Sequence, residues 1–233
     1  MRIAISGACS MGKSTVVQDF LRNWSNYTEG KLTYKVQFKP HLHSTDIMNM
    51  IHLGNRTNQE AIRDSIIDDI SKYKREDNVI FDRGLMDNLM YSLYLCGVGA
   101  EGCTNEWMTE QLPIYREAFK FYDLIFFVPL LTGYSAPIIP EGSLELDREV
   151  IFRSESDNIF KALQQQYLDG KRIWLPKEDT PALVELFGTP EERIQMIRLY
   201  INENGQPYGD DESLIKPHLP EALDLMQEMS NTK

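Results

Sequence analysis

The feature that most constrains the fold of this chain is a short glycine-containing segment near its amino terminus. Residues 7–14 read GACSMGKS, which fits the spacing G-x-x-x-x-G-K-[ST]. Glycines at the two fixed positions let successive backbone N–H groups turn inward around one bound anion. Lys13 adds a positive charge that reaches the outer phosphates of a nucleotide, and the Ser14 hydroxyl is a ligand for the accompanying Mg²⁺. The segment therefore predicts a phosphate-binding loop.

The residues on either side supply the context that such a loop requires. An apolar run at 2–6 predicts a strand that leads into the loop, and the pattern over 13–23 predicts a helix whose positive end faces the phosphates. The four fixed positions recur by chance in roughly one chain per hundred of this length, so a chance match is the alternative, and the strand–loop–helix context argues against it. The residues expected to contact the nucleotide are Gly7, Ala8, Cys9, Ser10, Met11, Gly12, Lys13, Ser14 and Thr15.

The rest of the chain alternates short apolar runs with helical patterns. Further strands are predicted at 34–38, 78–82, 123–128 and 172–175, and further helices at 58–74, 85–95, 107–121, 146–168 and 190–202. Buried strands separated by helices are typical of a parallel sheet with helices on both faces. We therefore expect an α/β fold of the three-layer P-loop NTPase type, with a five-stranded parallel sheet flanked by helices.

Two stretches interrupt this alternation. Residues 130–143 carry several glycine and proline turns and read as a long loop, and we expect a lid in the region 130–156. The segment after residue 204 is acidic and contains prolines, with a helix predicted at 220–229. We therefore expect one domain over residues 1–204 and an acidic C-terminal appendage over 205–233.

Composition excludes several classes of protein. The formal net charge is −11 and no cluster of basic residues occurs, which disfavours a long nucleic acid as a partner. No apolar run approaches the roughly eighteen residues of a membrane-spanning helix, and the apolar run at 3–5 is too short for a signal peptide. The three cysteines lack CxxC spacing, which indicates a reducing compartment and no structural zinc. We therefore expect a cytoplasmic protein without a membrane partner.

Asp82 ends the predicted strand at 78–82 and places a carboxylate at the carboxyl edge of the sheet, where ligands of such sheets bind. We expect Asp82 to face Lys13 and Ser14. There it would either hold the Mg²⁺, directly or through water, or accept the proton of an acceptor hydroxyl. The alternative is a strand-ending Asp that only caps the next helix.

Arg83 follows Asp82 at the position where ATPase motors usually place a Glu that orients a hydrolytic water. A cation at this position suits an anionic acceptor or a transferring phosphoryl group better than an activated water. The guanine-reading motif [NT]-K-x-D does not occur in the sequence, since the nearest segment, 176–179, reads PKED. The pair Asp82-Arg83 therefore favours phosphoryl transfer over ATP or GTP hydrolysis.

Arg148 and Arg153 follow the long loop and are candidates for cations that a lid brings over the phosphates. On a regular helix, five residues advance about 140° past a full turn, so both arginines cannot point at one phosphate. The alternative is a solvated helix face. Lys39 and His41 follow the strand predicted at 34–38, and we expect them to contact the acceptor, with an ordinary polar loop as the alternative.

With these residues in place, the chain resembles the P-loop nucleoside and nucleotide kinases over residues 1–203. It is most similar to the nicotinamide riboside kinase domain of bifunctional NAD-biosynthesis proteins and to related small ATP-binding kinase-like proteins, some of them carried by phages. The segment at 140–142, followed by Asp147, Arg148 and Arg153, resembles the lid of that group, and residues 188–193 resemble the start of its final helix. Asp82-Arg83 also resembles the Asp-Arg pair of thymidylate kinases, in which the arginine contacts the acceptor.

The resemblance implies a kinase that uses ATP and Mg²⁺ to phosphorylate a nucleoside, nicotinamide riboside or a nucleoside monophosphate. It implies catalytic roles for Lys13, Asp82, Arg83, Arg148 and Arg153, and metal ligation by Ser14 and Asp82. Two other functions stay open: a nucleotide-dependent ATPase or switch whose acidic tail docks a protein partner, and a polynucleotide 5′-kinase, which the net charge disfavours. A homodimer also stays open at this point.

Overall fold

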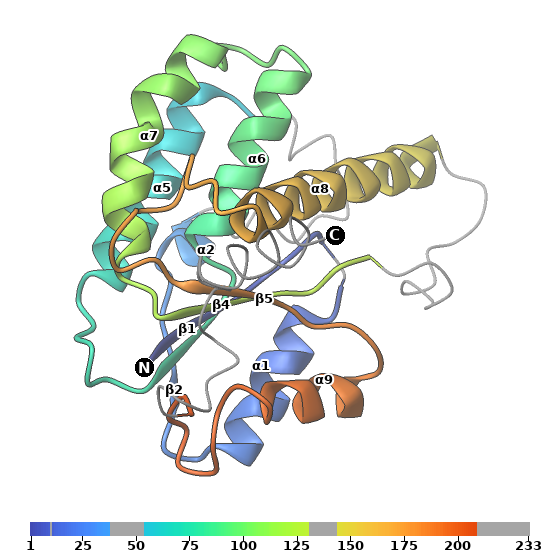
Figure 1. Ribbon diagram of the computed structural model, residues 1–233. Coiled ribbons are helices and arrows are strands. Elements are labelled where there is room, and N and C mark those ends of the chain that lie inside the picture. Colours follow the sequence, from blue (N-terminus) through green and yellow to red (C-terminus); the bar gives the residue numbers. More distant parts are fainter. Residues whose placement is uncertain (10, 38–53, 131–143, 209–233) are drawn as a thin grey trace, which may run out of the picture.

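Five strands in the described part of the chain form one parallel sheet. The computed structural model describes residues 1–9, 11–37, 54–130 and 144–208, with only the backbone of 36–37 and 144–150 (Figure 1). The spatial order of the strands is β2-β3-β1-β4-β5, and all neighbouring pairs are parallel. The strands are β1 (Arg2–Ser6), β2 (Thr28–Glu29), β3 (Val79–Asp82), β4 (Leu124–Phe127) and β5 (Ala182–Glu185).

Helices cover both faces of this sheet, as Figure 1 shows. One face carries α1 (Lys13–Asn23) and α9 (Pro190–Ile197), which contact each other. The other face carries α5 (Arg56–Ile70), α6 (Leu85–Gly97), α7 (Asn105–Phe119) and α8 (Leu144–Leu168), while the short α2 (Tyr34–Gln37) contacts α5. This arrangement confirms the predicted three-layer α/β fold with a five-stranded parallel sheet.

The central strands divide the core between the two faces. Side chains alternate across a strand, so Ile3 and Ile5 of β1 pack with α1 and α9, whereas Ala4 packs with the four-helix layer. β3 behaves in the same way, with Ile80 on the first face and Phe81 on the second. Because both faces are covered, residues 3–5 of β1 and 79–81 of β3 are all apolar, which explains why the sequence predicted these strands.

The strand predicted at 34–38 is wrong in position. β2 lies earlier, at Thr28–Glu29, and residues 34–37 form the helix α2. The two residues of β2 are exposed and polar, so no apolar run marks them, and backbone hydrogen bonds to β3 hold the strand in place. Tyr34, one of the apolar residues that suggested a strand, is buried in the four-helix layer.

The strand predicted at 172–175 is also wrong. The fifth strand is β5, at Ala182–Glu185, which pairs with β4. Residues 172–175 form an irregular segment whose apolar side chains, Trp174 and Leu175, pack on the four-helix layer. Arg116 of α7 fixes this segment by donating a hydrogen bond to the Ile173 carbonyl at 2.8 Å. The apolar run therefore marks the packing of Trp174 and Leu175, while Ile173 is exposed and no strand forms.

The predicted long helices are present, with ends shifted by a few residues. The last one begins with a capping box, since the Thr189 hydroxyl accepts a hydrogen bond from the Glu192 N–H while the Glu192 carboxylate accepts one from the Thr189 N–H. The helix predicted at 220–229 lies outside the described residues. Within the described ranges, no helix has the length and apolar character needed to cross a membrane.

Residues after α9 return to the first face of the sheet. The Trp24 indole donates to the Asn202 carbonyl at 2.8 Å, and the buried Tyr27 hydroxyl donates to the Gly205 carbonyl at 2.5 Å. These bonds extend the packed part of the chain to at least Gly205, next to the boundary expected at residue 204.

Candidate functional site

The loop between β1 and α1 has the backbone conformation that its glycines permit. Gly7 has φ 150°, and a Cβ atom at this residue would lie 2.5 Å from the Val128 carbonyl oxygen at the end of β4. Gly12 has φ 79° and is the N-cap of α1. Both positions therefore require glycine, one for its close approach to β4 and the other for its left-handed backbone. The phosphate loop predicted from the sequence has the backbone that such a loop needs, with Ser10 outside the described residues.

Lys13 lies inside this loop. Its ammonium donates hydrogen bonds to the carbonyls of Gly7, at 2.8 Å, and of Ala8, and the residue is only 4% exposed. Burial, together with the nearby guanidinium of Arg83, lowers the pKa of Lys13 to about 7. The two carbonyls therefore hold the ammonium where a bound phosphate would offer it a stronger, charged acceptor.

Arg193 of α9 reaches the same loop from the far end of the chain. Its guanidinium donates to the Met11 carbonyl at 3.1 Å. Sequence reasoning missed this residue, because nothing in the local pattern of α9 distinguishes an arginine that faces the loop from one that faces water. The contact fixes the last turn of the loop before α1 begins.

Asp82 ends β3 beside the start of α1. Its Oδ2 accepts a hydrogen bond from the Ser14 hydroxyl at 2.8 Å and lies 3.2 Å from the Lys35 ammonium. Its Oδ1 is buried and has no hydrogen-bond partner among the described residues. Burial alone would raise the pKa of Asp82, but Lys35, the Ser14 hydroxyl and Arg83 together hold the pKa below its usual value. The sequence predicted that Asp82 faces Ser14, and the structure places the two side chains in contact.

The pair Asp82 and Ser14 fits a hard divalent cation. Mg²⁺ prefers oxygen ligands and is usually held by one or two protein side chains together with substrate phosphates. Here a hydroxyl and a carboxylate meet at the carboxyl edge of the sheet, and one carboxylate oxygen is buried without a partner among the described residues. An orphaned buried oxygen needs a donor or a cation, so the residues present suit such an ion.

Helix capping at this edge belongs to Asp87 rather than to Asp82. The Asp87 carboxylate is buried and accepts a hydrogen bond from the N–H of Gly84, the N-cap of α6, at 3.1 Å. Its other oxygen lies 3.3 Å from the Arg83 guanidinium. This arrangement leaves Asp82 to Ser14 and Lys35, and it argues against the alternative in which Asp82 is only a cap.

Arg83 has a left-handed backbone conformation, with φ 73°. Few non-glycine residues adopt this conformation, and it is found most often where function requires a particular side-chain direction. The Arg83 N–H donates to the Ile5 carbonyl at 2.9 Å, so the sheet fixes the residue, while Asp87 fixes one end of the guanidinium. The side chain is about one-quarter exposed and keeps further donors available.

The lid candidates lie on α8. Arg153 is buried, 3% exposed, and the neighbouring Phe152 stacks on Tyr91 of α6 at 5.6 Å. Arg148 belongs to the same helix, although its side chain is not among the described ones. Since both residues belong to one helix, their backbone positions lie about 140° apart around its axis. Lys39 and His41 lie outside the described residues.

Asp157 ties α8 to the carboxyl edge of the sheet. Its carboxylate accepts a hydrogen bond from the Leu130 N–H at 2.6 Å and pairs with Lys161 at 2.6 Å. Because Leu130 directly follows β4, this contact holds the middle of α8 beside the strand that approaches Gly7. The sequence offered no signal for this role.

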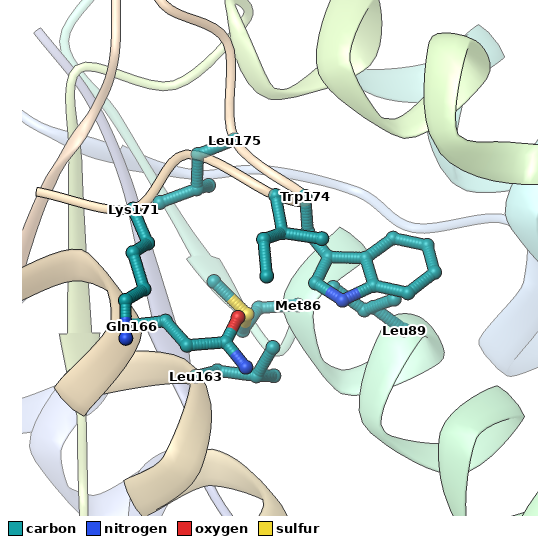
Figure 2. A pocket seen from close by; sticks show the side chains of 8 residues that line it. Met86, Leu89, Leu163, Gln166, Lys171, Trp174 and Leu175 are labelled. Carbon is teal, nitrogen blue, oxygen red and sulfur yellow. The ribbon is translucent and has the colours of Figure 1, made fainter. Parts of the chain in front are cut away.

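A small pocket lies away from these residues, between α6, α8 and the segment at 171–175 (Figure 2). Figure 2 shows an indole and aliphatic side chains around it, with the polar ends of Gln166 and Lys171 on one side. Its lining residues are Met86, Leu89, Leu163, Gln166, Lys171, Ile173, Trp174 and Leu175. No residue of the phosphate loop and neither Asp82 nor Arg83 lines it, so we assign it to packing.

Comparison with known proteins places this geometry in context. No protein-family model and no curated protein sequence matches the chain. Among solved structures, a deoxyadenosine kinase from M. mycoides with the products dCMP and dCDP bound has a TM-score of 0.55 at 15% identity, covering 84% of this chain and 96% of that one. The chain has the fold of the P-loop nucleoside and nucleotide kinases.

Two further structures agree. The NadR protein in complex with NR has a TM-score of 0.52 at 15% identity over 84% of this chain, which spans 50% of the NadR chain. A thymidylate kinase from Candida albicans has a TM-score of 0.50 at 17% identity, covering 90% of this chain and 95% of that one. The resemblance drawn from the sequence is thus confirmed at the level of the fold.

Proposed function

We propose that this chain is a kinase that transfers the γ-phosphoryl group of ATP to a nucleoside, nicotinamide riboside or a nucleoside monophosphate. The observation that carries the proposal is the meeting of Lys13, Ser14, Asp82 and Arg83 at the carboxyl ends of two adjacent strands. Many nucleotide-binding proteins share a phosphate loop. The carboxylate and guanidinium beside it favour transfer to an acceptor over hydrolysis.

The donor half of the reaction belongs to the phosphate loop. Lys13 exchanges the carbonyls of Gly7 and Ala8 for the β- and γ-phosphates, and the N-terminus of α1 faces the same anions. A Mg²⁺ ion held by Ser14 and Asp82 supplies neutralisation of the phosphate charge. Asp82 serves better as a ligand than as a base, since its pKa is lowered and its Oδ2 already bonds the Ser14 hydroxyl.

The acceptor half belongs to Arg83. Asp87 and the Tyr91 hydroxyl hold part of the guanidinium, and the remaining donors of the planar fork are left to grip a phosphate or the hydroxyls of a ribose. Arg153, and Arg148 from the preceding turns of α8, are the candidates for stabilising charge on the transferring group. Lys39 and His41 complete the proposed acceptor site.

Radiolabelled ATP and a panel of nucleosides, nicotinamide riboside and nucleoside monophosphates test this proposal. We expect a phosphorylated product with one of these classes. Lys13→Met and Asp82→Asn should each lower kcat by at least about 100-fold. Lys31→Met, which removes a lysine that is exposed, is the control and should retain activity.

Acceptor-independent release of phosphate at the full rate, with no labelled product from any class, would contradict the proposal. It is the result expected of an ATPase or switch that acts with a protein partner. The same assay therefore separates the two functions whichever acceptor the protein uses.

A further inference from the structure

Lys35 is a charged residue of the site that the proposed chemistry leaves without a role. It belongs to α2, in the segment where the sequence predicted a strand, and its ammonium lies 3.2 Å from Asp82 Oδ2. The Ser14 hydroxyl bonds the same oxygen at 2.8 Å. One carboxylate oxygen thus carries two donors, while the other, Oδ1, is buried without a partner among the described residues.

The backbone around Lys35 is fixed by contacts of its own. Two residues earlier, Thr33 donates both its N–H and its hydroxyl to the carboxylate of Asp69, a buried residue of α5. Leu32 and Tyr34 are buried in the four-helix layer. The Lys35 N–H donates to the Leu32 carbonyl at 3.2 Å. These contacts place the stem of Lys35 beside Asp82.

We infer that Lys35 is the resident cation of the Asp82 site, which keeps divalent metal out until the nucleotide arrives. The inference deepens the proposed function, since it rests on Asp82 and Ser14 being the ligands of the metal that accompanies ATP. In the nucleotide-free protein, Lys35 neutralises Asp82. When the phosphates bind, the ammonium leaves Asp82, and metal and nucleotide enter together.

The charges of the site support this order of events. Lys35 and Arg83 carry positive charge near Asp82 and Asp87, and Lys13, whose pKa is lowered to about 7, adds a partial positive charge, so a divalent cation added alone would enter a site whose two carboxylates are already neutralised. A metal ion and neighbouring ammonium or guanidinium groups repel each other strongly in a partly buried site. ATP brings several negative charges and reverses the balance. Metal and nucleotide should therefore bind with positive coupling, which is reciprocal by thermodynamic linkage.

The displacement is sterically simple because Lys35 is not locked in. Its side chain is 33% exposed, whereas that of Asp82 is 16% exposed. A flexible four-carbon stem lets the ammonium swing into water while the carboxylate stays in place. The Ser14 hydroxyl needs only to rotate, so that its oxygen faces the metal instead of donating to Asp82.

Titration of nucleotide-free protein with Mn²⁺, followed by the electron paramagnetic resonance signal of the free ion, tests the inference. We expect weak binding to the wild-type chain and binding tighter by at least about tenfold to Lys35→Met. Lys31→Met removes the same charge four residues earlier and should change Mn²⁺ affinity less than about twofold, because the Lys31 side chain is exposed and its charge is screened by solvent ions. Asp82→Asn in the Lys35→Met background should abolish the gain.

Three results would overturn the inference: wild-type binding as tight as that of Lys35→Met, an equal gain in Lys31→Met, or a gain that survives Asp82→Asn. None of them involves an acceptor or turnover, so the outcome is independent of whether the protein proves to be a kinase. Circular dichroism of each variant shows whether it folds.

A second measurement uses the unmodified chain. Labelling of lysines by an amine-reactive reagent, read by mass spectrometry, should modify Lys35 at least about threefold faster once Mg²⁺ and a non-hydrolysable ATP analogue are added together. Lys31 is the internal reference. An unchanged or slower rate at Lys35, with the analogue shown to be bound by its thermal shift, would contradict displacement.

Discussion

Arg83 combines a strained backbone with a side chain that we propose binds the acceptor, and two substitutions separate these properties. Its φ of 73° lies in the left-handed region, which costs a non-glycine residue about 1–2 kcal/mol. Arg83→Ala removes the ion pair with Asp87 and keeps the strain, whereas Arg83→Gly removes the ion pair and relieves the strain. The greater freedom of glycine in the unfolded chain offsets part of the relief. We therefore expect the glycine variant to be more stable than the alanine variant by about 1 kcal/mol.

Both variants should also be less stable than the wild-type chain, and this loss of stability has a separate origin. The Asp87 side chain is only 3% exposed, and without Arg83 it keeps the hydrogen bond from Gly84 but loses its cation. Removing one partner of such a bond costs about 1–3 kcal/mol. Urea unfolding followed by circular dichroism measures both differences, and thermal unfolding should show a gap of about 2–4 °C between the two variants.

Enzyme kinetics of Arg83→Ala and Arg83→Gly test whether the Arg83 side chain binds the acceptor. Both variants should bind ATP nearly as tightly as the wild-type chain and should lose about 100-fold in kcat/KM for the acceptor. Arg83→Lys should restore little, because a point charge cannot reproduce a bidentate grip. An alanine variant at least as stable as the glycine variant would refute the strain argument. ATP binding weakened tenfold in both would assign Arg83 to the donor instead.

Three further predictions concern stability. Burial lowers the pKa of Lys13 from 10.5 to about 7, so between these two pH values the folded chain binds fewer protons than the unfolded chain. In that window the unfolding free energy of the wild-type chain should rise, relative to that of Lys13→Met, by up to about 1.4 kcal/mol per pH unit. Urea midpoints of the two proteins that change in parallel with pH would contradict this. Thr189→Ala should cost about 1 kcal/mol and Thr189→Ser much less, and equal losses in melting temperature would exclude the capping role. Truncation after residue 204 removes the Gly205 carbonyl that accepts from Tyr27 and should cost about 1–3 kcal/mol relative to truncation after Tyr208, which keeps that carbonyl; equal unfolding curves of the two truncated chains would contradict the contact.

The sequence predicted the part of the site that local geometry determines. A phosphate loop is continuous in sequence, so its spacing and its flanking strand and helix identify it, and α1 has the predicted bounds. Asp82 and Arg83 were predictable because a parallel strand always delivers its last residues to the same edge.

What the sequence could not predict depends on pairing between distant segments. Lys35 and Arg193 reach the site from α2 and α9, and their partners, Asp82 and Met11, are set by tertiary packing. The strands at both edges of the sheet were misplaced for a related reason. An edge strand needs only a partner for its backbone, so β2 is polar, while the apolar run at 172–175 packs Trp174 and Leu175 on the four-helix layer without pairing.

The position of β1 has a consequence for how the chain acquires its site during synthesis. Both neighbours of β1 in the sheet, β3 and β4, lie far downstream, and Gly7 is shaped by its approach to Val128. A ribosome must therefore release more than half of the chain before the first fifteen residues can close around a phosphate. Such non-local pairing slows folding, and nascent chains that end before β4 should not be retained on immobilised ATP.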